Sequence, residues 1–269
     1  MQSDPNPVVD NSPEDTATGH TNLRPDRLES NNTPEKPNSQ GQPMPYTLAF
    51  DVYGTLINTA GVVDALRPHL GERAAAFSSR WREKQLEYSF RRGLMGAYRD
   101  FSICTRDALS YTCREFDLGL TGAQSQALLD AYRVLPAFDD ARQALEMLSQ
   151  TQHRLYAFSN GLPGDVENLL QHACIRDYLL DVISVDEIKS FKPDPAVYRL
   201  FNQRTQSEAQ ETWLISSNPF DILGAHHCGF HTAWVQRQAS ALFDPWGIEP
   251  SATITGLTEL VGVLGESTA

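Results

Sequence analysis

One strand-like segment stands alone before a long helical block, and the remaining strand-like segments follow that block. Residues 46–51 form a short apolar run ending in Asp51, and apolar residues recur at helical spacing from 62 to about 137. Beyond this block the sequence predicts helices over 139–150, 163–173, 194–204 and 219–228, which precede strands at 154–159, 181–185, 212–217 and 231–235. This alternation is typical of a parallel sheet covered by helices on both faces.

We therefore predict an α/β fold with a doubly wound, Rossmann-like parallel sheet. Its core comprises residues 46–60 and 138–269, and residues 61–137 form a helical insert. Residues 1–45 hold eight of the 16 prolines and no aromatic residue. Because such a segment buries too little apolar surface to offset its ordering entropy, we predict a disordered N-terminal tail.

Composition excludes several classes of partner. The chain has 22 basic and 34 acidic residues, a net charge of −12, which argues against nucleic-acid and anionic membrane partners. It has no apolar run long enough to span a membrane. Its four cysteines form no C-x-x-C pair, so we expect reduced thiols in a cytoplasmic protein. His226, His227, Cys228 and His231 lack the spacing of a metal site.

Polar residues follow the strands at the points where each strand ends. In open α/β sheets ligands bind at the carboxyl ends of the strands. Four strand ends bring an acid, hydroxyls, amides and an amine to that edge: Asp51, Tyr53 and Thr55; Ser159, Asn160 and Gly161; Asp186 and Lys192; and Ser216, Ser217, Asn218 and Asp221. Their convergence predicts a site for a small molecule.

Four segments in this order resemble the motifs of the haloacid dehalogenase superfamily. They are Phe50-Asp51-Val52-Tyr53-Gly54-Thr55-Leu56, Ser159-Asn160-Gly161, Lys192-Pro193 with Tyr198 beyond it, and Ser216-Ser217-Asn218-Pro219-Phe220-Asp221. The resemblance covers roughly residues 46–262. It implies that the insert at 61–137 is the helical cap of that superfamily.

The residue at position 53 indicates which reaction within the superfamily to expect, phosphate-ester hydrolysis or dehalogenation. Phosphatases carry a second acid at this position to protonate the leaving alcohol, and a neutral phenol is a poor substitute. Asp51 and Asp221 are the only acidic candidates for magnesium ligands in these motifs, and two carboxylates make a weak magnesium site. Together with the segment from Trp81 to Tyr88, these features resemble the L-2-haloacid dehalogenases, which implies an enzyme without a metal or another cofactor.

The resemblance assigns the reaction to eight residues. Asp51 would attack C2 of the haloacid and form an ester that water then hydrolyses, giving the D-2-hydroxy acid. Thr55 would orient Asp51, and Lys192 would stabilise its negative charge. The other assignments are Arg82 to receive halide, Asn218 and Asp221 to position and activate water, and Ser216 and Tyr198 to orient Lys192 and its polar neighbours.

The substrate would be a small carboxylate. By resemblance, Ser159 and Asn160 would bind its carboxylate group. The remaining pocket residues would be Tyr53, Leu86, Phe101 and Phe220.

Two departures from the subfamily leave the substrate open. Glu83 stands where a neutral glutamine is expected, and Phe220 where a tryptophan is common. If Glu83 faced the pocket, it would favour a substrate with a cationic amine. The alternatives are therefore a halogen-free carboxylate, such as azetidine-2-carboxylate or a specialised metabolite, then a magnesium phosphatase, then a non-catalytic binding module. The resemblance also implies a homodimer.

Overall fold

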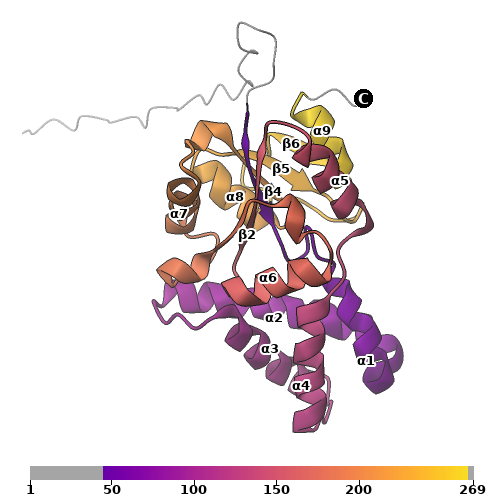
Figure 1. Cartoon of the computed structure of the whole chain (residues 1–269). Helices are drawn as coiled ribbons and strands as arrows, with labels where there is room; N and C mark the ends of the chain where they lie inside the picture. Colours follow the sequence, from indigo (N-terminus) through magenta and orange to yellow (C-terminus); the bar gives the residue numbers. More distant parts are fainter. Residues whose placement is uncertain (1–44, 266–269) are drawn as a thin grey trace, which may run out of the picture. The chain divides into compact units, whose positions relative to one another are not determined.

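A computed structural model describes residues 45–265, so the predicted tail, apart from Pro45, lies outside the described residues. A parallel sheet of six strands forms the centre, in the order β3-β2-β1-β4-β5-β6 (Figure 1). Its strands are β1 Thr47–Asp51, β2 Arg154–Ser159, β3 Asp181–Ser184, β4 Thr212–Ser216, β5 His231–Val235 and β6 Ala252–Ile254. The predicted doubly wound parallel fold is confirmed.

Helices alternate with these strands along the second half of the chain. They are α5 Asp139–Ser149, α6 Pro163–His172, α7 Pro195–Thr205, α8 Pro219–His227 and α9 Leu260–Val263. The first four begin and end within one residue of their predicted bounds. The sequence analysis missed β6 and α9, which have three and four residues and are too short for a periodic pattern.

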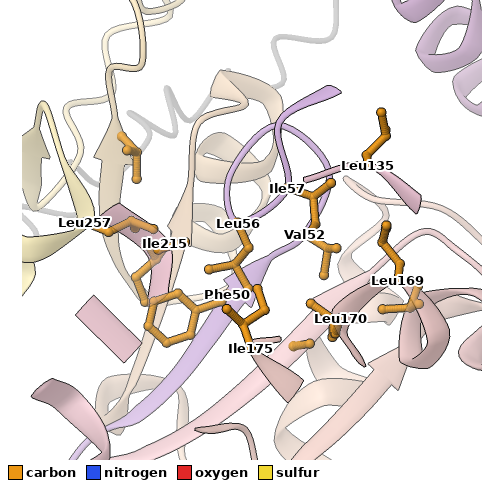
Figure 2. Packing of buried hydrophobic residues seen from close by; sticks show 14 of the residues in the cluster. Phe50, Val52, Leu56, Ile57, Leu135, Leu169, Leu170, Ile175, Ile215 and Leu257 are labelled. Carbon is orange, nitrogen blue, oxygen red and sulfur yellow. The ribbon is translucent and has the colours of Figure 1, made fainter. Parts of the chain in front are cut away.

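Both faces of the sheet are covered, as the burial of β1 shows. Successive side chains of a strand point to opposite sides, so a strand that is buried throughout has packing on both faces. All five residues of β1 are buried. Leu48 and Phe50 belong to one hydrophobic cluster, whereas Ala49 between them belongs to a second cluster. In Figure 2, Phe50 lies with Leu56 and Ile215 in the first cluster.

Four helices lie between β1 and α5 and contribute no strand to the sheet. They are α1 Val63–Leu70, α2 Ala74–Leu94, α3 Phe101–Glu115 and α4 Gly122–Ala131. With their connections they occupy residues 59–134, close to the predicted bounds 61–137, and from here on the helical insert means residues 59–134. Trp81 is fully buried and its Nε1 donates to the Thr105 carbonyl at 2.9 Å, which joins α2 to α3. None of the helices among residues 45–265 combines the length and apolar character needed to span a bilayer.

The strand order reverses direction between β1 and β4. From this point β2 and β3 extend to one side, and β5 and β6 extend to the other. Ligands of open α/β sheets bind at such a switch point, at the carboxyl ends of the strands. Here Asp51 ends β1 and Ser216 ends β4.

Candidate active site

The carboxylate of Asp51 is held by four donors. Its Oδ2 accepts from Thr55 Oγ1 at 2.9 Å, Ser216 Oγ at 3.2 Å and Asn218 Nδ2 at 2.7 Å. Its Oδ1 accepts from Lys192 Nζ at 3.2 Å. Since Asp51 is 7% exposed, these bonds replace most of its hydration. One oxygen is therefore saturated and fixed, and the other keeps lone pairs for a reaction.

Lys192 is buried between two carboxylates. Besides Asp51, its Nζ donates to Asp221 Oδ2 at 2.8 Å and to the Phe158 carbonyl at 2.8 Å. All three ammonium protons thus have partners, which a buried cation needs. The Asn160 side chain accepts from the Lys192 backbone N–H at 2.9 Å, so that amide oxygen positions Lys192.

Asp221 and Tyr198 extend this network into the core. Tyr198 Oη donates to Asp221 Oδ1 at 2.8 Å, and both residues are fully buried. Loss of hydration raises the pKa of Asp221, and the Asp51 charge raises it too, while Lys192 opposes both effects. Burial and the Asp221 charge raise the pKa of the Tyr198 hydroxyl, which therefore stays protonated as a donor.

Ser216 contacts the polar neighbours of Lys192 and not Lys192 itself. Its hydroxyl donates to Asp51 and accepts from the Asn218 backbone N–H at 3.1 Å. Tyr198 reaches Lys192 only through Asp221. Ser216 sits directly beside Asp51 because β1 and β4 are neighbouring parallel strands.

Ser217 is a further member that the sequence analysis did not assign. Its backbone N–H donates to Thr55 Oγ1 at 2.9 Å, and its hydroxyl donates to the Gly54 carbonyl at 2.8 Å. Gly54 has φ +92°, a left-handed conformation that favours glycine. The Thr55 hydroxyl proton can reach Asp51 Oδ2 at 2.9 Å or Ser217 Oγ at 3.3 Å, and the contact to Asp51 is the shorter. Its place beside Ser216 was the available signal.

Arg82 approaches the site from α2. Its Nη2 donates to the Tyr53 carbonyl at 3.3 Å and its Nη1 to Gln85 Oε1 at 3.5 Å. Its guanidinium lies 6.0 Å from the centre of the Phe101 ring, and Phe101 stacks on Tyr53 with ring centres 6.3 Å apart. Within residues 45–265 no carboxylate pairs with Arg82, so its charge is available to an anion.

The other predicted pocket residues include Leu86, Phe220 and Ser159, and none of these three has a hydrogen bond to Asp51 among the described residues. Leu86 is half-buried on α2, one turn beyond Arg82. Phe220 packs edge-on against Phe90 of α2 with ring centres 5.0 Å apart, which identifies Phe90 as a wall residue that the sequence analysis missed. Ser159 is buried, and its hydroxyl accepts from the Gly161 N–H at 3.1 Å.

Glu83 points away from the site. Its side chain is 64% exposed and pairs with Arg80 at 3.1 Å on the outer face of α2. The condition for a cationic amine in the substrate, that Glu83 faces the pocket, is therefore not met.

The polar cluster does not fit a divalent metal. Its two carboxylates, Asp51 and Asp221, both bond to the Lys192 ammonium, and Asn218 directs N–H donors to Asp51. A cation would meet positive charge and donors there. Over residues 45–265 no three His, Cys, Asp or Glu side chains gather as a metal-binding group.

A family model, relatives by sequence and a solved structure all match this chain to the same family. A family model for haloacid dehalogenase-like hydrolases matches residues 47–229. The (S)-2-haloacid dehalogenase of Pseudomonas sp. strain YL is 36% identical over 80% of this chain and 92% of its own length. The haloacetate dehalogenase H-2 of Moraxella sp. strain B is 33% identical over 81% and 96%.

A solved structure agrees with these relatives. The L-2-haloacid dehalogenase of Xanthobacter autotrophicus with chloropropionic acid covalently bound superposes with a TM-score of 0.78 at 30% identity, covering 84% of this chain and all of that one. The match spans both the sheet and the helical insert, and the resemblance inferred from the motifs is confirmed. The chain belongs to the haloacid dehalogenase-like hydrolases.

Proposed function

We propose that this protein hydrolyses small L-2-haloacids to D-2-hydroxy acids through an ester on Asp51, without a metal. The carrying observation is the unequal environment of the two Asp51 oxygens: three donors fix Oδ2, and within residues 45–265 Oδ1 accepts from Lys192 alone. A weak carboxylate nucleophile needs such aiming and partial desolvation. Relatives named as haloacid and haloacetate dehalogenases support this substrate class.

In the first step Asp51 Oδ1 attacks C2 of the substrate. The new C–O bond forms as the carbon–halogen bond breaks, and halide leaves with the bonding electron pair from the opposite face, so C2 inverts. Halide needs no proton, which is consistent with Tyr53 where a phosphatase has an acid. Arg82 receives the halide, because its guanidinium lies at the aromatic wall formed by Tyr53 and Phe101.

In the second step water attacks the ester carbonyl carbon of Asp51. The bond between that carbon and Oδ1 breaks, so the product leaves with the oxygen that Asp51 supplied. Asn218 and the other Oδ2 donors stabilise negative charge on Oδ2 during this attack. Asp221, with its raised pKa, accepts one proton of the attacking water by way of Lys192, and this proton passes to the departing alkoxide to form the product hydroxyl. The second proton of water is released to solvent as Asp51 becomes a carboxylate again.

Ser159 and Asn160 bind the substrate carboxylate in this scheme, with Leu86, Phe90 and Phe220 as the apolar wall. We assign Ser159 and the Asn160 amide N–H₂ group to this contact, since the Asn160 oxygen already accepts from Lys192.

The helical insert acts as the cap that excludes water. Burial raises the pKa of the Tyr53 phenol, which weakens it further as an acid for phosphate esters.

Halide release tests the proposal directly. Wild type, Asp51→Asn and the control Asp64→Asn are incubated with L- and D-2-chloropropionate in EDTA. Asp64 is 86% exposed on α1 and pairs only with Arg67. We expect release from the L isomer alone, by wild type and the control, and none by Asp51→Asn. Release that EDTA abolishes, or that Asp51→Asn retains, would contradict the proposal.

A further inference from the structure

Two chain segments join the helical insert to the sheet, and they run side by side. Residues 52–58 leave β1, and residues 135–140 lead into the first turn of α5. The Asn58 N–H donates to the Pro136 carbonyl at 2.8 Å, and the Phe138 N–H donates to the Leu56 carbonyl at 2.9 Å. We call this pair of segments the junction. Because it contains Thr55, the junction reaches the nucleophile itself.

Arg237, two residues beyond β5, contacts both segments of the junction. Its Nη2 donates to the Thr55 carbonyl at 2.6 Å. Its Nη1 donates to Asp140 Oδ1 at 2.9 Å and Oδ2 at 2.7 Å. The guanidinium also lies 4.0 Å from the centre of the Phe138 ring. One rigid side chain, 14% exposed, thus holds the segment that leaves the sheet and the one that returns.

Asp140 ties this contact to the end of the described chain. It lies in the first turn of α5, and its Oδ2 also accepts from the Leu257 N–H at 2.7 Å. Arg237 therefore cannot shift without breaking bonds to separate parts of the core. The bonds to Thr55 and Asp140 come from two different nitrogens of the planar guanidinium, a geometry that a lysine ammonium does not reproduce.

We propose that Arg237, fixed by Asp140, is a positioning residue for the reaction, an inference that rests on the proposed function. By holding the Thr55 carbonyl it fixes the Thr55 hydroxyl, which donates to Asp51 Oδ2 at 2.9 Å. By holding both segments of the junction it also sets the placement of the insert that carries Arg82.

The chain offers a matched control for the test. Arg176 makes the same kind of fork, since it pairs with Glu167 and donates to the Leu179 carbonyl at 2.6 Å. Its side chain is 22% exposed, and it lies before β3, at the amino ends of the strands, whereas Asp51 lies at their carboxyl ends. Loss of either fork should lower Tm by a similar amount, but only loss of Arg237 should disturb the site.

The experiment measures kcat and KM for halide release from L-2-chloropropionate. We expect Arg237→Ala to lower kcat about tenfold or more with little change in KM. The kcat of Arg237→Lys should lie between those of wild type and Arg237→Ala. Arg176→Ala should keep the kcat of wild type. In a Thr55→Val background, Arg237→Ala should lower kcat by a smaller factor than in wild type, because the route through the Thr55 hydroxyl is already lost. Equal losses of kcat in Arg237→Ala and Arg176→Ala, or a fully additive double variant, would overturn the proposal.

Hydrogen exchange gives a readout without turnover. Peptides covering 52–60 and 134–142 should exchange faster in Arg237→Ala than in Arg176→Ala. If wild type released no halide, the proposed function would fail, and exchange would still decide whether Arg237 holds the junction. Unchanged exchange in both peptides would show that it does not.

Discussion

Lys192 Nζ lies 3.2 Å from Asp51 Oδ1, although 141 residues separate them in the sequence. The Lys192 side chain is 1% exposed, so its charge is neutralised by protein groups and not by water. The carboxylates of Asp51 and Asp221 are the two groups that neutralise it. The cluster has two carboxylates and one ammonium, and its stability depends on the shared cation.

Replacing this cation should be costly. Lys192→Met leaves two buried carboxylates facing each other, and we expect it to lower the free energy of unfolding by about 3–5 kcal/mol, as for a broken buried pair. Halide release should fall by about 10³-fold, since the nucleophile loses its only Oδ1 donor among the described residues. Urea unfolding and an initial-rate assay provide the measurements.

Lys189→Met is the matched control for Lys192→Met. Lys189 is 63% exposed and pairs with Asp186, so we expect a loss below about 1 kcal/mol. Similar losses for the two variants would refute a shared cation at the centre of the site.

The sequence predicted the sheet and the strand ends because these depend on local patterns. The strand-like runs alternate with amphipathic helices, and the polar residues come directly after these runs in the sequence. The parallel arrangement then predicts that Asp51, Lys192, Ser216 and Asp221 gather at the carboxyl ends of the strands, but not which of them bond to one another.

Contacts between distant segments could not be predicted in this way. Glu83 turns outward because Arg80 lies one helical turn away, and Ser216 bonds to Asp51 because β4 neighbours β1. Arg237 looked like an ordinary loop residue, since Thr55 and Asp140 lie 182 and 97 residues away. Side-chain direction and tertiary packing decide such contacts, and a periodic pattern carries neither.

Gly224 should be required next to Tyr198. A Cβ at this position of α8 would lie 2.4 Å from Tyr198 Oη and 2.7 Å from Pro193 Cβ. We expect Gly224→Ala to displace the Tyr198 hydroxyl from Asp221, to cost about 1–3 kcal/mol of stability, and to lower kcat. Thermal unfolding and halide release measure these effects.

Gly164→Ala is the control for Gly224→Ala. Gly164 lies in α6 with nothing within 4 Å of its added Cβ, so alanine there should be neutral or stabilising. Adding Tyr198→Phe to Gly224→Ala should recover part of the stability, because the hydroxyl is the closest clashing atom. A Gly224→Ala variant as stable and active as Gly164→Ala would contradict the prediction.

Asp221 should make the stability of the protein depend on pH. Because burial raises its pKa in the folded state, the folded protein holds this proton more tightly than the unfolded chain does. The resulting stabilisation is complete below the unfolded-chain pKa and is lost as pH rises through the folded-state pKa. Asp221→Asn cannot titrate. Its free energy of unfolding, relative to wild type, should therefore rise with pH from about 4 upward and then level off. Urea unfolding across this range measures it, and a difference independent of pH would contradict the sign.

Isotope transfer should identify the atom that attacks the substrate. With enzyme in excess over L-2-chloropropionate in H₂¹⁸O, each Asp51 reacts at most once. Because water attacks the ester carbonyl, the heavy oxygen should enter Asp51 and the product hydroxyl should remain unlabelled. Label should reach the product only after repeated turnovers.

Mass spectrometry of tryptic peptides measures both pools of this isotope experiment. Asp51 and Asp221 fall on different peptides because arginines lie between them, which makes the Asp221 peptide an internal control that should stay unlabelled. If the product of the first turnover carried the heavy oxygen and Asp51 did not, water would attack C2 directly. Asp51 would then act as a general base, and the three donors on its Oδ2 would orient a proton acceptor in place of a nucleophile.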